Sequence, residues 1–251
     1  MITATKLDEL AKKYETVDFI KDDPVQFPNR FNNPKDIEIA GFIASMFAYG
    51  NRKVFIKKLN ELFVIAQNQP LDYVLNFEPN SLKGFNYRFS KDFDIIEIFK
   101  ILKKLYLRDG GLKSLFKYGY EQEKDIQKML QVVTDYFYSN QKNEVGQGFY
   151  HMVPNPSHGG AMKRMNMYLR WLVRKSPVDL GIWDFIPRSE LLIPLDVHVA
   201  RLSREMGLLK RNSNDFKAVL ELTSKLKEFC PQDPIKYDFA IFGLGVDTLK
   251  N

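Results

Sequence analysis

The stretch that decides the fold is AMKRMNMYLRWLVRK, residues 161–175. Its apolar residues recur at helical spacing, so the pattern predicts an amphipathic helix with Lys163 in its first turn. The apolar stripe of that helix is formed by Met165, Tyr168, Leu169, Leu172 and Val173. The stretch carries five basic residues and no acidic one. Three interpretations are therefore open: a solvated basic face, a surface that binds nucleic acid, or the seat of a reactive lysine.

The rest of the chain is also mainly helical in pattern. Residues 36–62 place apolar side chains at helical spacing and predict two helices, with Gly50-Asn51 as the break between them. Residues 93–107 predict another helix that stops at the Asp-Gly-Gly sequence 109–111, and residues 112–139 predict two more. Alternating apolar runs bounded by turns, which indicate strands, are scarce. We therefore expect an all-α fold.

Asn, Gly, Pro and Ser are concentrated between residues 140 and 160. This composition predicts a long irregular connection, which leads directly into the 161–175 stretch. No internal repeat or low-complexity tract divides the sequence, so we expect residues 1–251 to form a single unit with lobes.

Composition narrows the class of protein. The single cysteine, Cys230, excludes an internal disulfide framework and any zinc site or iron–sulfur cluster built from four cysteines. The three histidines lack a metal-ligand spacing, so we expect no metal and no cofactor. No apolar run approaches the roughly 18 residues of a membrane helix and the N-terminus lacks a secretory pattern, so we expect a cytoplasmic protein without a membrane partner. The net charge of +6 favours a polyanionic partner such as nucleic acid.

A second decisive segment is IPLDVHVARLSREMGLL, residues 193–209. Asp196 stands where a helix N-cap belongs, and Val199, Leu202 and Met206 mark the buried side of the helix that follows. Capping is the simplest role for Asp196, but a capping aspartate can also face a cleft, so a chemical role stays open. Four further polar residues could form a group near the site, but a surface or capping role is the favoured interpretation of them: Asp233, Lys236, Tyr237 and Asp238.

Two motifs in these segments resemble those of a known superfamily. PLDVHVARL, residues 194–202, is similar to the proline–x–aspartate–x–histidine–valine signature of the helix–hairpin–helix DNA glycosylases, which include endonuclease III. KRMNMYL, residues 163–169, resembles their lysine–x–x–asparagine–x–x–leucine helix. The interval of 33 residues from Lys163 to Asp196 is closer to the archaeal 8-oxoguanine glycosylase branch than to endonuclease III. The sequence around both motifs also resembles a bacterial family of unknown function assigned to this superfamily.

The resemblance implies a two-lobed helical fold with its site at these two motifs. It implies that Lys163 is the nucleophile of a bifunctional glycosylase and that Asp196 is its catalytic carboxylate. Gly159 matches the first glycine of the superfamily's hairpin, whose backbone amides bind a DNA phosphate, and Ala161 replaces the second glycine. On this basis we expect Gly159 and Gly160 to contact DNA.

The residue types suit this chemistry. A lysine attacks the sugar C1′ to form a Schiff base only as the neutral amine, and the positive charges of Arg164 and Arg170 favour loss of its proton. We expect these two arginines and Arg174 to face DNA phosphates as well. A carboxylate can move the proton and stabilise positive charge that develops on the sugar. The target base must leave the duplex, and the candidates to line its pocket are Phe149, Tyr150, Asn166, Trp171, Trp183 and His198.

The sequence therefore predicts a DNA base-excision repair glycosylase, with Schiff-base lyase activity on a damaged base as a possible second function. Two alternatives stay open. One is a non-catalytic nucleic-acid-binding protein that keeps the glycosylase fold, and the other is an enzyme that acts on a small nucleoside-like substrate. Salt-dependent DNA binding without a covalent adduct would indicate the binding protein, because phosphate contacts persist without chemistry.

Overall fold

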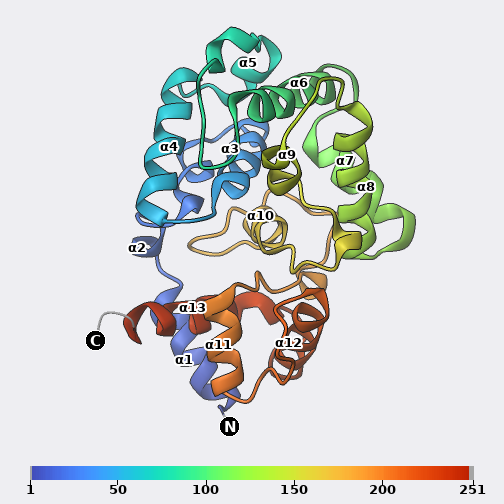
Figure 1. Cartoon of the computed structure of the whole chain (residues 1–251). Coiled ribbons are helices and arrows are strands. Elements are labelled where there is room, and N and C mark those ends of the chain that lie inside the picture. The colour runs from blue at the N-terminus through green and yellow to red at the C-terminus, as the bar shows by residue number, and fades with distance from the viewer. Residues whose placement is uncertain (1, 249–251) are drawn as a thin grey trace. The chain divides into compact units, whose positions relative to one another are not determined.

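The structure of the chain is helical. The computed structural model describes residues 2–248, and within that range it contains helices, turns and isolated bridges but no β-strand (Figure 1). Helix accounts for 66% of the structure, which confirms the expected all-α class. No helix in this described range is both long enough and apolar enough to cross a membrane.

The chain folds as two compact units. Met1–Val25 and His158–Asn251 form one of them, here called the terminal unit, and Gln26–Ser157 form the other, here called the middle unit. The helices of the terminal unit are α1 (Ala4–Tyr14), α2 (Val17–Ile20), α10 (Lys163–Val173), α11 (Val197–Glu205), α12 (Phe216–Phe229) and α13 (Tyr237–Thr248). Those of the middle unit are α3 (Pro34–Phe47), α4 (Arg52–Ile65), α5 (Pro70–Leu75), α6 (Asp92–Arg108), α7 (Leu112–Glu123), α8 (Ile126–Asn140) and α9 (Gln147–Met152).

Short 3-10 turns connect several of these helices. They are η1 (Pro24–Gln26), η2 (Pro28–Arg30), η3 (Pro79–Leu82), η4 (Pro156–His158), η5 (Arg188–Glu190) and η6 (Pro234–Lys236). Five of these six turns begin at a proline, and η5 begins directly after Pro187. The fixed φ of proline suits the first residue of such a turn.

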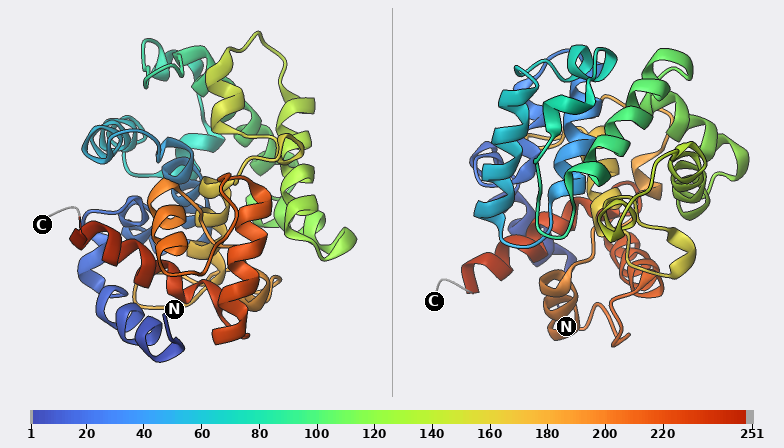
Figure 2. Two further views of the ribbon diagram at one scale, coloured as in Figure 1. Left: turned by 60° about the horizontal axis from the view of Figure 1, so that its bottom comes forward. Right: turned by 45° about the horizontal axis from the view of Figure 1, so that its top comes forward.

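The core of the middle unit is built around α3. Pro34 occupies the first turn of this helix, and the side chain of Asn33 caps it. Residues 37–47 are all buried, so the helix is covered on every side, and α4, α5 and α7 each contact it (Figure 2). The predicted break is confirmed, because Gly50 has a φ of +80° and Asn51 caps α4.

The predicted irregular connection near residues 140–160 contains a helix. Residues Gln147–Met152 form α9, and the side chains of Phe149 and Met152 are buried in the middle unit. A Cβ placed on Gly148 would lie 2.5 Å from the Cα of Ser90, in the segment that leads into α6. The glycine therefore permits close packing of two backbones, and the prediction of an irregular chain is wrong for this part.

In the terminal unit, α13 packs against helices from both ends of the chain. Helix α1, from the start of the chain, packs along α13, and α11 also contacts it (Figure 1). The contact face of α1 is its buried stripe of Leu7, Leu10 and Ala11. The ring of Phe19 adds an edge-to-face contact with Phe239, with their centroids 5.1 Å apart. Residues from both ends of the chain thus share one core.

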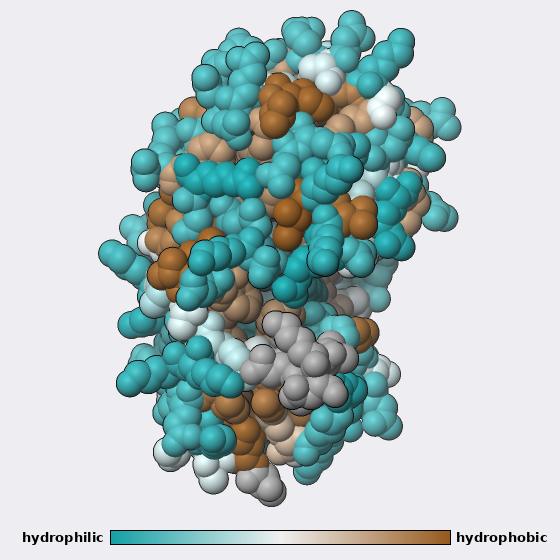
Figure 3. Space-filling model, turned by 90° about the vertical axis from the view of Figure 1, so that its left-hand side faces the viewer, coloured by the Kyte–Doolittle hydropathy of each residue, from teal (hydrophilic) through white to brown (hydrophobic). Residues whose placement is uncertain are grey.

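Hydrophilic side chains predominate on the face drawn in Figure 3. Among the coloured residues of that face, apolar side chains occur in small groups that are separated from one another. Scattered apolar groups of this kind are normal on a protein surface.

A substitution at Gly111 tests the backbone geometry of the turn between α6 and α7. Its φ is +94°, and a Cβ there would lie 2.7 Å from the Tyr106 ring. We expect Gly111→Ala to lower the free energy of unfolding by about 2–4 kcal/mol, because backbone strain of about 1–2 kcal/mol adds to an overpacked contact.

Gly84→Ala is the matched control for this substitution. Gly84 has a φ of +77°, but a Cβ there would have no neighbouring heavy atom within 4 Å. The control variant should therefore lose only the contribution of backbone strain. Urea unfolding of both variants measures the difference, and equal losses would contradict the packing of Tyr106 against Gly111.

Candidate active site

Lys163 begins α10, and Asp196 caps α11. The Nζ atom of Lys163 lies 3.9 Å from Oδ2 of Asp196, and the two side chains are 30% and 22% exposed. This separation brings opposite charges together without a direct hydrogen bond. The structure therefore brings together the two residues for which the sequence predicts chemistry, and leaves both accessible to solvent.

The backbone at each helix start positions this pair. Met162, which precedes Lys163, has a φ of +51°, and this left-handed residue turns the chain into α10. Oδ1 of Asp196 accepts hydrogen bonds from the backbone N–H groups of His198 and Val199, both at 2.9 Å. Oδ2 is the oxygen within ion-pair distance of the lysine. Asp196 is therefore an N-cap, as predicted, and faces Lys163 at the same time.

Arg170 follows Lys163 on the same helix but is buried, with 4% of its surface exposed. Its Nε donates to Oδ1 of Asp179 at 3.3 Å, and its Nη1 donates to Oδ2 of Asp238. The guanidinium carbon lies 4.3 Å from the centroid of the Phe239 ring. A buried guanidinium with these partners offers no surface to a phosphate, so the predicted DNA contact of Arg170 is wrong.

Arg174 is buried in the same way. Its Nη1 donates to Oε1 of Glu15 at 2.7 Å and also to Asp179, and its Nε donates to Oδ1 of Asp233 at 2.9 Å. Its predicted DNA contact is wrong for the same reason. Glu15 directly follows α1, so this arginine ties the start of the chain to α10. The sequence suggested that Arg170 and Arg174 belong to an exposed basic surface. In the structure both form buried ion pairs.

Burial also changes the acidity of the partners of these arginines. Burial raises the pKa of Asp238 to about 6, although the charge of Arg170 opposes the change. The negative charge of Asp196 raises the pKa of Asp238 further, and the positive charge of Lys163 lowers it. Burial likewise raises the pKa of Asp179, against the effect of the arginines. Asp238 is therefore a third titratable group that interacts with the Lys163–Asp196 pair.

Asn166 is a buried polar residue on α10. Its Nδ2 donates to the carbonyl of Ala161 at 3.2 Å, whereas its Oδ1 has no hydrogen-bond partner among the described residues. A buried acceptor without a donor is unusual, and it suits a position that receives a donor from a ligand. Asn166 thus stays a candidate pocket residue.

The other pocket candidates of the terminal unit lie in the core or on the surface. Trp171 and Trp183 are almost completely buried, and the ring of Trp183 packs edge-on against Tyr168 at 5.4 Å. Rings in these positions cannot stack on an extruded base, so both tryptophans are core residues and the prediction is wrong for them. His198 is exposed at the start of α11.

The predicted phosphate-binding turn precedes α10. Gly159 has a φ of +73°, and a Cβ on Gly159 or Gly160 would meet no heavy atom within 4 Å. The carbonyl of Gly159 accepts a hydrogen bond from the backbone N–H of Phe216 at 2.8 Å, which anchors the turn to the start of α12. Arg164 is partly exposed in the first turn of α10. These positions are open to solvent, as a phosphate contact requires.

Two aromatic candidates belong to the middle unit. Phe149 is fully buried, and its ring packs edge-on against that of Tyr150 at 5.4 Å. Because a buried ring cannot reach a base, the pocket prediction is wrong for Phe149. Tyr150 is 45% exposed, so its predicted role stays a prediction.

The sequence predictions missed Asp179 and gave no pairing role to Asp238. A signal for both was present, because each is an acidic residue inside an otherwise apolar run, VDL at 178–180 and YDFAIF at 237–242. Carboxylates in such runs must be neutralised or paired when the run is buried. No group of three or more His, Cys, Asp or Glu side chains in residues 2–248 is arranged to hold a metal ion.

The raised pKa of Asp238 has a consequence for stability. Its pKa is raised from 3.8 to about 6 in the folded chain, so between pH 4 and 6 the folded state binds more protons than the unfolded state. The contribution of Asp238 to stability is therefore largest below about pH 4 and decreases as the pH rises toward 6. At about 1.4 kcal/mol per tenfold change in proton affinity, the decrease is about 3 kcal/mol.

Asp238→Asn removes this titration. We expect the difference in unfolding free energy between wild type and Asp238→Asn to decrease by about 2–3 kcal/mol between pH 4 and pH 7. Urea unfolding of both proteins at the two pH values measures the change. A difference that stays constant would show that Asp238 keeps its ordinary pKa in the folded chain, and one that increases with pH would show that folding lowers this pKa.

Comparison with known proteins adds a family assignment. The family described as "Protein of unknown function (DUF2400)" matches residues 23–247, a range that includes both Lys163 and Asp196. No curated protein and no solved structure matches the chain. Because the match covers most of the 251 residues, the chain belongs to the DUF2400 family.

Proposed function

We propose that this chain is a DNA base-excision repair glycosylase with Schiff-base lyase activity, built on the two-lobed helix–hairpin–helix glycosylase fold. The observation that carries the proposal is the Lys163–Asp196 pair, an amine and a carboxylate 3.9 Å apart in a partly exposed position. The sequence motifs at both positions resemble those of the glycosylase superfamily, and the all-α class agrees with that fold.

Asp196 has the geometry of a general base for Lys163. One of its oxygens is held by two backbone N–H groups, and the other lies nearest the lysine ammonium. A carboxylate fixed at one oxygen keeps the other in a constant direction, which favours proton transfer in a defined geometry. Because a lysine attacks carbon only as the neutral amine, transfer of its proton toward Asp196 is the first step of the proposed reaction.

The proposed reaction then proceeds at the sugar C1′. The Nζ atom of Lys163 forms a bond to C1′ while the bond from C1′ to the base breaks, and the base leaves with the bonding electrons and takes the proton that Asp196 accepted from Lys163. The new ammonium at C1′ then passes one proton to the ring oxygen, whose bond to C1′ breaks. Opening of the sugar ring gives the protonated Schiff base. As its proton passes to the leaving base, Asp196 regains its negative charge, which stabilises the positive charge that develops on the sugar in the transition state.

DNA contacts are assigned to the residues around the start of α10. Gly159 and Gly160 leave open space at the turn, so a phosphate can approach their backbone closely, and Arg164 lies partly exposed next to Lys163. Arg170 and Arg174 have a different role in the proposal: their buried ion pairs hold α10 in position. Asn166 is assigned to the pocket, because its Oδ1 is an unpartnered acceptor one turn after Lys163.

Borohydride trapping tests the nucleophile. With a duplex that contains an abasic site, we expect the wild-type chain to form a covalent adduct that sodium borohydride makes permanent, and we expect Lys163→Ala to form none. Lys175→Ala is the matched control, because this exposed lysine follows the same helix and should trap like the wild type. An adduct of equal yield in Lys163→Ala would assign the chemistry to another amine.

Asp196→Asn tests the carboxylate separately from the cap. Asparagine caps helices as well as aspartate does, so the variant should unfold within about 0.5 kcal/mol of the wild type. Because the variant lacks the carboxylate that acts as general base, adduct formation should be about 10²–10⁴-fold slower in single-turnover trapping. An unchanged rate in the folded variant would remove Asp196 from the mechanism.

The two alternative functions predict other results in the same experiments. A non-catalytic nucleic-acid-binding protein would bind the duplex with a strong salt dependence and give no adduct with wild type or variant. An enzyme for a small nucleoside-like substrate would bind the duplex weakly, consistent with the burial of Arg170 and Arg174. Anisotropy measurements on the same labelled duplex distinguish these two cases.

A further inference from the structure

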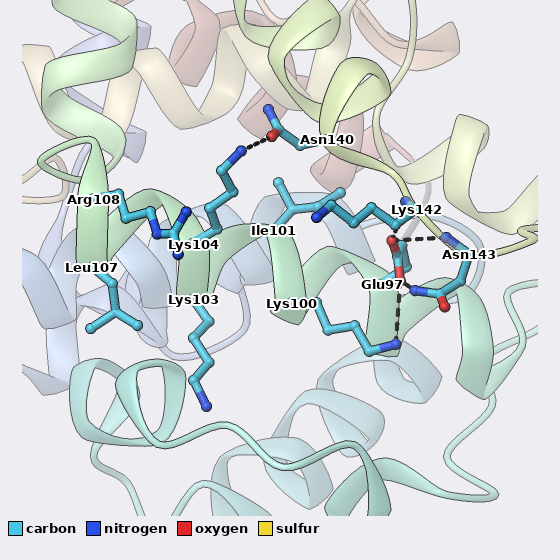
Figure 4. Close-up of a pocket in the computed structure, with 10 residues that line it drawn as sticks. All are labelled: Glu97, Lys100, Ile101, Lys103, Lys104, Leu107, Arg108, Asn140, Lys142 and Asn143. Atoms are coloured by element: carbon cyan, nitrogen blue, oxygen red, sulfur yellow. Dashed lines mark hydrogen bonds and ion pairs between the residues drawn. The ribbon is translucent and has the colours of Figure 1, made fainter.

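A second charged site lies in the middle unit, along α6 and the segment that follows α8. A pocket of about 320 Å³ is present there (Figure 4). Its charged lining consists of one carboxylate, Glu97, and five cationic side chains: Lys100, Lys103, Lys104, Arg108 and Lys142. Five positive charges less one negative charge leave a net charge of +4 around a single concavity.

Helical spacing explains part of this cluster. Lys100, Lys104 and Arg108 are four residues apart, so their side chains leave α6 on the same side. Lys142 comes from the segment after α8, and Figure 4 shows its side chain running back over α6 in the direction of Lys104. Like charges at these spacings repel each other, so their convergence is unfavourable unless an anion binds among them.

Glu97 balances only one of the five charges. Its Oε1 accepts hydrogen bonds from the backbone N–H groups of Lys142 at 2.7 Å and Asn143 at 3.3 Å, and its Oε2 accepts one from the Asn143 side chain. The ammonium of Lys100 lies 3.5 Å from the same Oε2. Glu97 is 2% exposed, so its main role is to fasten the 142–143 segment to α6. This contact positions Lys142 at the pocket.

The other cations of the pocket have no acidic partner among residues 2–248. The ammonium of Lys103 donates to a backbone carbonyl at 3.0 Å, and that of Lys104 donates to Oδ1 of Asn140, both of which are uncharged acceptors. In the described part of the chain, neither Arg108 nor Lys142 pairs with a carboxylate. The backbone carbonyl of Phe77 and the side chain of Asn140 thus hold two of the cations in place without neutralising them.

We propose that this pocket binds phosphate groups. Its net charge of +4 exceeds what a single carboxylate ligand would balance, and a ligand with two or more phosphates would match it. The guanidinium of Arg108 can bind phosphate oxygens in a bidentate way, and the lysines can act as point charges around it. Ile101 and Leu107 supply an apolar wall for the organic part of such a ligand. The phosphates come either from a nucleic-acid strand or from a small molecule that carries a diphosphate.

The test uses the full chain and a double variant, Arg108→Gln/Lys142→Gln. Both side chains are exposed and have no partner within the described residues, so the variant should keep the unfolding midpoint of the wild type. Lys53→Gln/Lys57→Gln is the matched control, because it removes two exposed charges from α4 in the same unit but outside the pocket. Calorimetric titration with sodium pyrophosphate and anisotropy with a labelled single-stranded oligonucleotide report the two sources of phosphate.

We expect saturable binding of at least one probe by wild type and control, and binding at least about tenfold weaker in the double variant. If the source is a nucleic-acid strand, the salt dependence of log K should also become shallower by about 1.4, since each lost phosphate contact on a single strand removes about 0.7. If the source is a small diphosphate, the double variant should lose pyrophosphate binding and should bind the oligonucleotide as the wild type does. Equal weakening in the control, or no saturable binding of either probe by the wild type, would overturn the proposal.

Discussion

The two guanidinium groups buried on α10 constrain the terminal unit more than any other feature. A buried charge without a partner is unfavourable, and breaking such a pair costs about 3–5 kcal/mol. Arg170 therefore needs Asp179 and Asp238, which approach α10 from the following segment and from α13. Arg174 in turn pairs with Glu15, from the start of the chain. Because these contacts fix α10, they also fix Lys163, the first residue of that helix.

As a result, the two ends of α10 carry charged side chains in different environments. Its start carries an amine next to the capping carboxylate of α11, and its later turns carry charges that are satisfied internally. The coupling of Asp238 to both regions follows from the same arrangement, since its carboxylate pairs with Arg170 and responds to the charges of Lys163 and Asp196. The buried ion pairs restrain the helix that carries Lys163, and restrained supporting residues are what a pre-organised nucleophile requires.

The sequence predicted those helix ends that depend on interactions between neighbouring residues. The break at Gly50-Asn51 and the cap at Asp196 were predicted because a left-handed glycine and a side-chain cap are decided within a few residues. The pairing of Lys163 with Asp196 was predicted through a resemblance between motifs, not through spacing. The structure places the two side chains 3.9 Å apart.

Partners that are distant in the sequence could not be predicted in this way. The sequence of a basic helix face is the same whether water or a distant carboxylate covers that face. The pairing of Arg170 with Asp238, 68 residues away, is therefore known only from the structure. The basic pocket of the middle unit was missed for a similar reason. Lys142 joins the lysines of α6 only because Glu97 holds its backbone, 45 residues from its own position. Long-range ion pairs and hydrogen bonds leave no periodic signal.

The central claim is that Lys163 is the reactive amine of this chain. The most direct measurement is mass-spectrometric mapping of the borohydride-reduced adduct with abasic DNA after proteolysis of the full chain. The account predicts that the sugar remnant is attached to Nζ of Lys163, in the peptide that begins α10. A remnant on the N-terminal amine or on any other lysine, or no modified peptide at all, would contradict it.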